Sequence, residues 1–120
     1  MHMSEERDAD GLAITAYGPG FVRIDQTRHE TALALLADRL LPTPPTDPLD
    51  PAYLEGLLAH EPEVVLLGTG PRLRFPHPRV MAVFQGRGIG CEVMDSGAAC
   101  RTFNILRGEG RRVLAVILPP

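Results

Sequence analysis

The clearest pattern in the chain is a run of four apolar residues, Val64 to Leu67, between Pro62 and a Gly68-Thr69-Gly70 segment. Four residues are too few for a core helix, and the absence of polar alternation means that both faces of the segment favour burial. This pattern predicts a central strand of a parallel sheet. The two glycines predict a tight loop after the strand, where the backbone can approach another group closely.

The residues after this loop predict alternating helices and strands. Ala99, Phe103 and Leu106 are spaced to form the buried face of one helix. Proline, glycine and hydrophobic spacing indicate a short extended piece at residues 72–75, a helix from 76–78 to about 86, a strand at 89–93, a helix from the 94–97 turn to about 106, and a final strand at 113–118. The C-terminal half is therefore predicted to be β-α-β-α-β.

The N-terminal half predicts a β-hairpin, a proline-rich crossover and a short helix. Asp50 is a typical helix N-cap, and Pro51 suits the first helical position. Four prolines between residues 42 and 48 exclude regular structure before that helix. The expected elements are strands at 12–16 and 21–24 around a turn at 18–20, the crossover at 42–48, and a helix from 51 to about 60.

Residues 31–41 fit two structures. Their alanines, leucines, aspartate and arginine are helix formers, so propensity alone predicts a helix. Leu33, Leu35 and Ala37 also alternate along the segment, which is the spacing of a strand. The residues alone do not decide between the two.

Length and composition predict one soluble domain. The 120 residues suffice for a single core, and 44% hydrophobic with 22% charged residues is typical of globular proteins. No apolar run approaches the roughly 20 residues that cross a bilayer, and the polar, acidic start of the chain does not resemble a signal peptide. We expect a disordered tail at residues 1–10, a single globular domain at 11–120, and a cytoplasmic protein.

The net charge of −3 hides an uneven distribution. Up to Glu63 there are twelve acidic residues and four arginines, whereas from Val64 onward there are three acidic residues and eight arginines. This split predicts a basic face on the C-terminal half. Aromatic residues make up 5% of the chain, and no basic run is interleaved with them, so nucleic-acid binding is not indicated.

Motifs for cofactors and metals are missing from the sequence. Gly68-x-Gly70 begins like a dinucleotide fingerprint, but Leu73 stands at the third glycine position, so NAD or FAD binding is not expected. Cys91 and Cys100 lie nine residues apart, which is neither a zinc nor a C-x-x-C spacing. We expect no cofactor and no metal, and no base–nucleophile pair marks an enzyme.

The best candidate for a ligand site comes from geometry. The loops after two parallel strands share one edge of the sheet, where ligands bind in open α/β folds, and the second loop begins a helix whose free N–H groups favour an anion. Asp95 and Ser96 could instead satisfy those N–H groups as caps. The candidate ligand-binding residues are Gly68, Thr69, Gly70, Asp95, Ser96 and Gly97.

Cys100 is a candidate reactive thiol, because it lies early in the predicted helix beside Arg101 and both features lower a thiol pKa. No histidine is near in sequence to act as its base. A cysteine between Ala99 and Phe103 is more often a small core residue. We therefore expect Cys100 to be buried and inert.

Arginines supply a candidate partner-binding surface. Arg101, Asn104 and Arg107 are spaced along one helix face, and Arg111 and Arg112 follow in the next loop. Arginine is enriched where proteins recognise partners. The alternatives are a solvated face or internal neutralisation by the acidic N-terminal half.

Several segments resemble, in order and spacing, the family catalogued as domain of unknown function 498, the Mth-type domain. They are Leu66 to Gly70, Gly88-Ile89, Glu92 to Met94, Ala98 to Leu106 and Glu109 to Val113. The resemblance implies an α/β fold: a single three-layer domain with an N-terminal β-hairpin layer packed beside a β-α-β-α-β central sheet flanked by helices. It also implies that residues 31–37 form a strand, against their propensity.

The family includes a mitochondrial assembly factor of respiratory complex I, so the resemblance implies a non-catalytic assembly or adaptor module that binds another protein. A small anion-binding or metabolite-binding protein that uses the strand-end crevice is the alternative, and an enzyme is the third hypothesis. We expect a protein partner of unknown identity, no nucleic acid and no membrane insertion. A homo-oligomer stays open.

Overall fold

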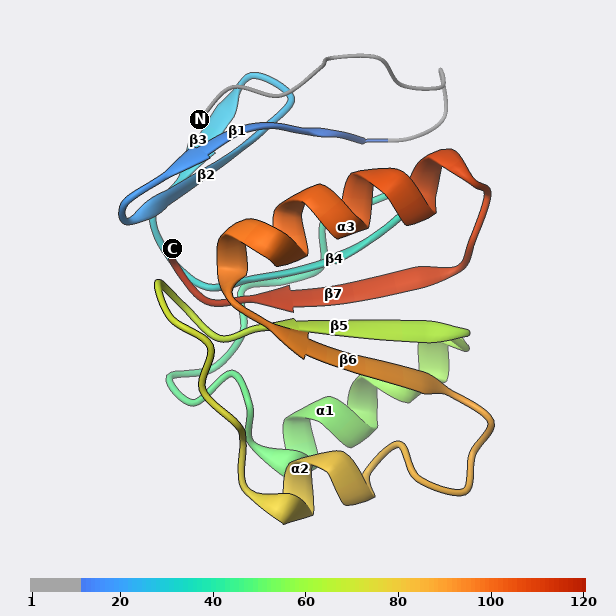
Figure 1. Cartoon of the computed structure of the whole chain (residues 1–120). Helices are drawn as coiled ribbons and strands as arrows, with labels where there is room; N and C mark the ends of the chain where they lie inside the picture. The colour runs from blue at the N-terminus through green and yellow to red at the C-terminus, as the bar shows by residue number, and fades with distance from the viewer. Residues whose placement is uncertain (1–11) are drawn as a thin grey trace.

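A four-stranded mixed sheet lies at the centre of the molecule (Figure 1). The computed structural model describes residues 12–120, and the tail expected at residues 1–10 lies outside them. The strand order is β4 (Leu33–Leu36), β7 (Val113–Ile117), β5 (Val64–Gly68) and β6 (Gly90–Met94). β5 pairs in parallel with β6 and β7, and β4 pairs antiparallel with β7. The prediction of a central strand at Val64–Leu67 is confirmed.

Both inner strands are buried on their two faces, because each face of the sheet is covered by a separate hydrophobic core. All five residues of β5 and all five of β7 are buried. Val64 and Leu66 face one core, whereas Val65 and Leu67 face the other. A polar side chain at any of these four positions would lie in a core, which is why the run shows no polar alternation.

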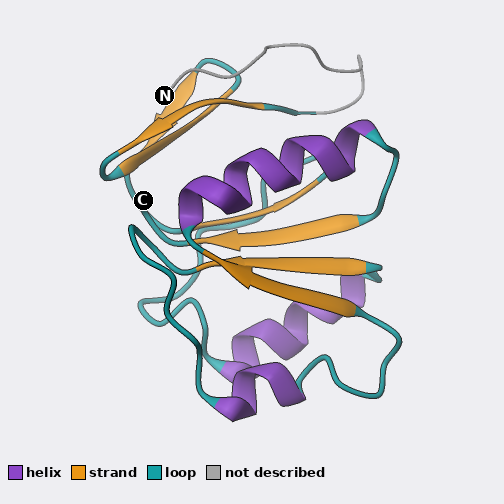
Figure 2. Ribbon diagram, in the orientation of Figure 1, coloured by secondary structure: helices purple, strands orange, loops and turns teal. Residues whose placement is uncertain are grey.

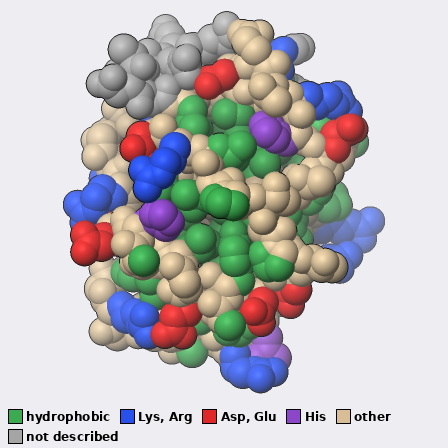
Figure 3. Space-filling model, turned by 180° about the vertical axis from the view of Figure 1, so that it is seen from behind, with side chains coloured by type: hydrophobic (Ala, Val, Ile, Leu, Met, Phe, Trp, Pro, Cys, Tyr) green, Lys and Arg blue, Asp and Glu red, His purple; other side chains and the backbone are tan. Residues whose placement is uncertain are grey.

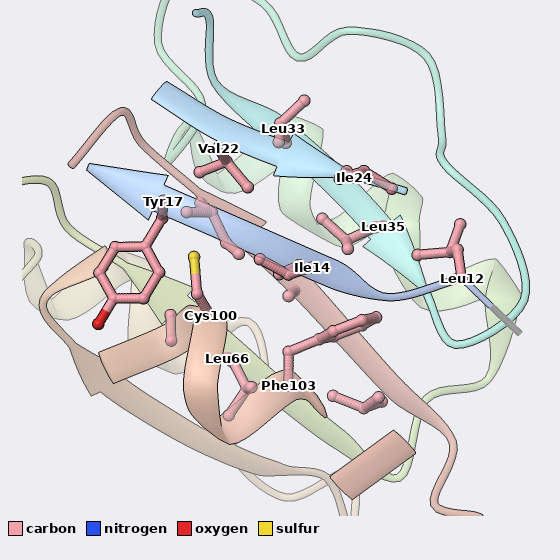
Figure 4. Packing of buried hydrophobic residues seen from close by; sticks show 14 of the residues in the cluster. Leu12, Ile14, Tyr17, Val22, Ile24, Leu33, Leu35, Leu66, Cys100 and Phe103 are labelled. Carbon is pink, nitrogen blue, oxygen red and sulfur yellow. The ribbon is translucent and has the colours of Figure 1, made fainter. Parts of the chain in front are cut away.

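The first core lies between the central sheet, α3 (Ser96–Gly108) and a small antiparallel sheet, as Figure 4 shows. The small sheet has the order β1 (Ile14–Gly18), β2 (Phe21–Ile24) and β3 (Thr27–His29). The predicted hairpin is confirmed. Its third strand was not predicted because Thr-Arg-His is polar and mostly exposed.

The second core lies on the opposite face of the central sheet, under α1 (Pro51–Leu57), the 3-10 turn η1 (Leu58–His60) and α2 (Pro78–Ala82), as Figure 2 shows. Asp50 caps α1 by accepting a hydrogen bond from the Tyr53 N–H at 3.3 Å, as its sequence position predicted. The helix expected to reach residue 86 ends at Ala82. A turn then places Val83 and Phe84 in the core.

The ambiguous segment after the small sheet is extended. β4 pairs with β7, with Leu35 opposite Ala115. Leu33 and Leu35 face the first core, and Ala34 faces the second. An extended chain directs alternate side chains to opposite faces of the sheet, so burial in both cores overrides the helix propensity. No helix in the described part of the chain is long and apolar enough to cross a bilayer.

At Gly68 the backbone of β5 lies close against α3. A Cβ at this residue would lie 3.0 Å from the Ala99 Cβ and 3.1 Å from the Ser96 Cα. We expect Gly68→Ala to lower the free energy of unfolding by about 1–3 kcal/mol, because a backbone atom must move to admit the methyl group. Urea denaturation measures the change.

The matched control is Gly56→Ala on α1, where an added Cβ meets nothing within 4 Å. This change should stabilise the protein by about 0.5–1 kcal/mol, because alanine loses less entropy than glycine in a helix. Equal stability of Gly68→Ala and wild type would contradict the close packing of α3 on β5.

Candidate functional site

The loops after β5 and β6 meet at one edge of the central sheet, as the sequence predicted. The Ser96 N–H donates to the Gly70 carbonyl at 2.9 Å, and the Gly70 N–H donates to the Ser96 Oγ at 2.8 Å. The six candidate ligand-binding residues, Gly68 to Gly70 and Asp95 to Gly97, are therefore brought together.

The polar groups of these loops bind one another. Asp95 Oδ1 accepts a hydrogen bond from the Ala98 N–H at 2.8 Å and so caps α3. Ser96 is fully buried, and its hydroxyl accepts the Gly70 N–H. The capping residues thus occupy part of the donor capacity that an anion would use. Ligand binding by these six residues stays a prediction.

A shallow hollow of about 450 Å³ lies beside this edge, between the small sheet and the start of α3. Tyr17 closes one side of it. Arg101 donates a hydrogen bond to the Tyr17 hydroxyl, and its guanidinium lies 5.9 Å from the centroid of the ring. Arg101 thus links α3 to β1.

Thr69 organises the chain that leaves β5. Its side chain is buried, with 5% of the residue exposed. The Thr69 hydroxyl donates to the Arg72 carbonyl at 2.7 Å and accepts from the Arg74 N–H at 3.0 Å. These two hydrogen bonds fix the turn that begins the next segment.

That segment, which we call the Pro71–Pro78 loop, carries the most exposed large apolar side chain in the described residues. Phe75 is 83% exposed and Leu73 is 49% exposed. Arg72 and Arg74 are exposed beside them, and no described side chain forms an ion pair with either. In the sequence, Arg72 to Phe75 suggested only an extended piece. The sequence did contain a signal for an exposed binding segment, which is the alternation of arginine with apolar residues between two prolines.

The predicted arginine face of α3 is not one exposed surface. Asn104 binds the backbone of β1, because its Oδ1 accepts from the Ile14 N–H at 3.1 Å and its Nδ2 donates to the Ile14 carbonyl at 2.8 Å. Arg107 is buried, with 7% exposed. Arg101 contacts Tyr17. Partner binding by these side chains stays a prediction.

The two arginines after α3 contact the acidic half of the chain. Arg111 Nε lies 3.3 Å from Glu63 Oε1, and Arg112 Nε donates to the Glu61 carbonyl at 3.1 Å. The Arg112 N–H also donates to Glu63 at 2.8 Å, and this hydrogen bond is the main reason that the pKa of Glu63 is lowered. On the face seen in Figure 3, basic side chains likewise lie beside acidic ones around an apolar centre.

The surroundings of both cysteines disfavour the thiolate form. Burial raises the pKa of Cys100 to about 12, although the charge of Arg101 acts in the opposite direction. Burial also raises the pKa of Cys91 to about 11, with a further contribution from the charge of Glu92. Cys100 is fully buried in the first core, as its neighbours in the sequence suggested.

Residues 14–118 match the model of a family described as "Protein of unknown function (DUF498/DUF598)". The chain belongs to this family. The match extends from the first residue of β1 to just beyond the end of β7, so it covers both sheets and all the helices. The resemblance inferred from the sequence motifs is confirmed.

Two relatives show how far the similarity to this DUF498 chain extends. An uncharacterised protein of Rhodobacter capsulatus is 34% identical over 111 residues, which are 92% of this chain and 87% of the relative. NADH dehydrogenase [ubiquinone] 1 alpha subcomplex assembly factor 3 of Mus musculus is 45% identical over 58 residues. Those residues are 48% of this chain and 31% of the mouse protein, so the match spans about a third of the assembly factor.

A solved structure supports the fold of this DUF498 chain. The Mth938-like domain of Bordetella pertussis superposes with a TM-score of 0.76 at 29% identity, covering 99% of this chain and 92% of the other. The expected α/β fold and the Mth-type resemblance are confirmed.

The anchoring role of Thr69 can be tested by removing its hydroxyl. We expect Thr69→Val to lower the free energy of unfolding by about 1–2 kcal/mol and to speed amide exchange at Arg74. The reason is that the hydroxyl loses its hydrogen bonds with the Arg72 carbonyl, the Met94 carbonyl and the Arg74 N–H, while the side-chain shape is kept. Thr69→Ser, which retains the hydroxyl, is the control. If the valine variant matches wild type in both measurements, Thr69 does not hold the loop.

The burial of Cys100 predicts slow reaction with thiol reagents. With Cys91→Ser and Cys100→Ser variants that isolate each thiol, Cys100 should react at least about tenfold more slowly than the half-buried Cys91 in the folded protein. Because both pKa values are raised far above 9, the rates should rise steadily between about pH 7 and pH 10. A plateau near pH 8 for Cys100 would show a reactive thiolate.

Proposed function

We propose that the protein is a non-catalytic assembly or adaptor module that binds another protein through the Pro71–Pro78 loop. Two observations support this proposal. About half of the chain is 45% identical to a mouse protein whose name is that of an NADH dehydrogenase assembly factor. The loop also presents the kind of side chains that dominate protein interfaces.

The exposure of the Phe75 side chain is the observation that supports the proposal most strongly. A phenylalanine that remains 83% exposed forgoes most of the roughly 2–3 kcal/mol that burial of its ring would contribute. The fold does not use this ring, since Phe75 is part of neither core. Exposed aromatic residues flanked by arginine are typical of the few residues that carry most of the binding energy at interfaces.

The loop is also held in shape before a partner arrives. The Thr69 hydroxyl fixes its start, and Pro71, Pro76 and Pro78 restrict the backbone on both sides of Phe75. Less conformational entropy is lost when a segment is already ordered, so this arrangement favours binding.

The charge of the loop indicates the chemistry of the partner. Arg72 and Arg74 of the loop are exposed, as is Arg79 just after it in α2, and no salt bridge of the described residues involves them. A protein surface with an apolar pocket for Phe75 and carboxylates around it would complement the loop. Charges at such a rim speed association and select the partner.

The test compares two exposed apolar side chains. We expect Phe75→Ala to keep the melting temperature of wild type but to lose a partner that co-purifies from the native cells, by at least about tenfold. Ile105→Ala on α3, where the side chain is 60% exposed, is the matched control and should retain that partner. Binding is then measured with the purified partner by calorimetry.

The assembly role requires a second measurement. In cells that lack the protein and contain an NADH dehydrogenase complex, wild type and Ile105→Ala should restore the assembled complex on native gels, and Phe75→Ala should not. Equal partner capture and equal rescue by the two alanine variants would reject the loop as the binding surface. If Phe75→Ala restores the assembled complex although it no longer captures the partner, the contact made by Phe75 is not required for assembly.

A further inference from the structure

A second pocket lies at the opposite edge of the central sheet, at the right-hand end of α3 in Figure 1. It has a volume of about 550 Å³, within the range of small-molecule sites. Its walls come from four segments: residues 36–39 at the end of β4, residues 59, 60 and 62 after α1, the end of α3, and residues 110–113 at the start of β7. None of these residues belongs to the Pro71–Pro78 loop.

Arg107 is the buried group that makes this pocket unusual. Only 7% of the residue is exposed, and its buried Nε has no hydrogen-bond partner. In the described part of the chain, no ion pair with Arg107 is found. A buried guanidinium is costly unless it is paired and hydrogen-bonded. The negative end of the α3 dipole, near which Arg107 lies, offsets part of this cost but leaves Nε unpaired.

The rest of the polar lining is also basic. Arg39, Arg111 and Arg112 face the pocket together with His60, and Asp38 is the acidic residue among the described lining residues. Arg39 binds Asp38 at 3.2 Å and donates to His60 Nδ1 at 3.3 Å.

The contacts of Arg111 with Glu63 and of Arg112 with the Glu61 carbonyl each occupy only part of the guanidinium. A guanidinium carries five N–H donors, so several donors on these side chains stay available to a ligand.

The apolar part of the lining restricts the kind of ligand. Leu36, Ala59, Pro62 and Val113 form walls beside the guanidinium groups. An inorganic ion would leave these apolar walls uncovered, whereas an organic anion would contact both the apolar walls and the guanidinium groups. Four arginines against Asp38 and Glu63, which pairs with Arg111, leave two positive charges and favour a ligand with two negative charges.

We propose that this pocket binds a small organic anion, a phosphate ester or a polycarboxylate, with Arg107 and Arg39 contacting its charged groups. Guanidinium groups bind phosphate and carboxylate through paired hydrogen bonds, which suits both ligand types. The site is separate from the partner loop, so either assignment can fail without the other.

Calorimetry at low ionic strength tests the site with two probes, inorganic pyrophosphate and citrate. We expect at least one of them to bind wild type with a dissociation constant below about 10 mM. Arg107→Met, which keeps the volume of the side chain, and Arg39→Gln at the pocket mouth should each weaken binding at least about tenfold. Arg87→Gln, which removes the surface ion pair with Glu55 outside the pocket, is the control and should bind as wild type does.

Pyrophosphate binding alone would indicate a phosphate ester, and citrate binding alone a polycarboxylate. The proposal is overturned if neither probe binds wild type, if either folded pocket variant binds as tightly as wild type, or if Arg87→Gln loses as much affinity as the pocket variants. If Arg107→Met fails to fold, Arg39→Gln still tests the proposal. The Arg39 side chain is about half exposed, so its replacement should leave the fold intact.

Discussion

Burial of both faces of β5 and β7 is the constraint on which the rest of the structure depends. Strands that are apolar on each side need a covering layer on each side. α3 with the small sheet supplies one layer, and α1 with α2 supplies the other. At Gly68, Ser96 and Ala99 of α3 pack so tightly on β5 that an added methyl group would force its neighbours to shift. The parallel order then brings the loops after β5 and β6 to one edge of the sheet.

The elements with strong burial patterns could be predicted from the sequence. Val64–Leu67, the hairpin and the capped helix at Asp50 follow from local chemistry alone. The strand at residues 33–36 does not follow from local chemistry alone, because the composition of the segment favours a helix. Pairing with β7 is what makes the extended form the more stable one. Thr27–His29 could not be predicted either, since backbone pairing with β2 forms this strand without any apolar pattern.

Site residues were harder to predict than strands, because a sequence does not show which polar groups bind one another. For the Asp95–Gly97 turn the sequence left two possibilities, an anion site or self-capping, and the structure shows that its side chains bind Gly70 and Ala98. The arginines of α3 looked alike, yet Arg101 contacts a tyrosine and Arg107 enters a pocket formed by segments distant in sequence. Thr69 was selected as a candidate ligand residue, and the sequence did not show that its hydroxyl also anchors a loop.

The central functional claim is that Phe75 itself contacts a protein partner. It is tested most directly by placing a photoreactive benzoylphenylalanine at position 75 in the native cells, with position 105 as the comparison. Irradiation should join position 75 to one defined protein, whose cross-linked segment lies beside acidic residues, and position 105 should not join to it. Failure of position 75 to cross-link to any protein, or the same product from both positions, would contradict the claim.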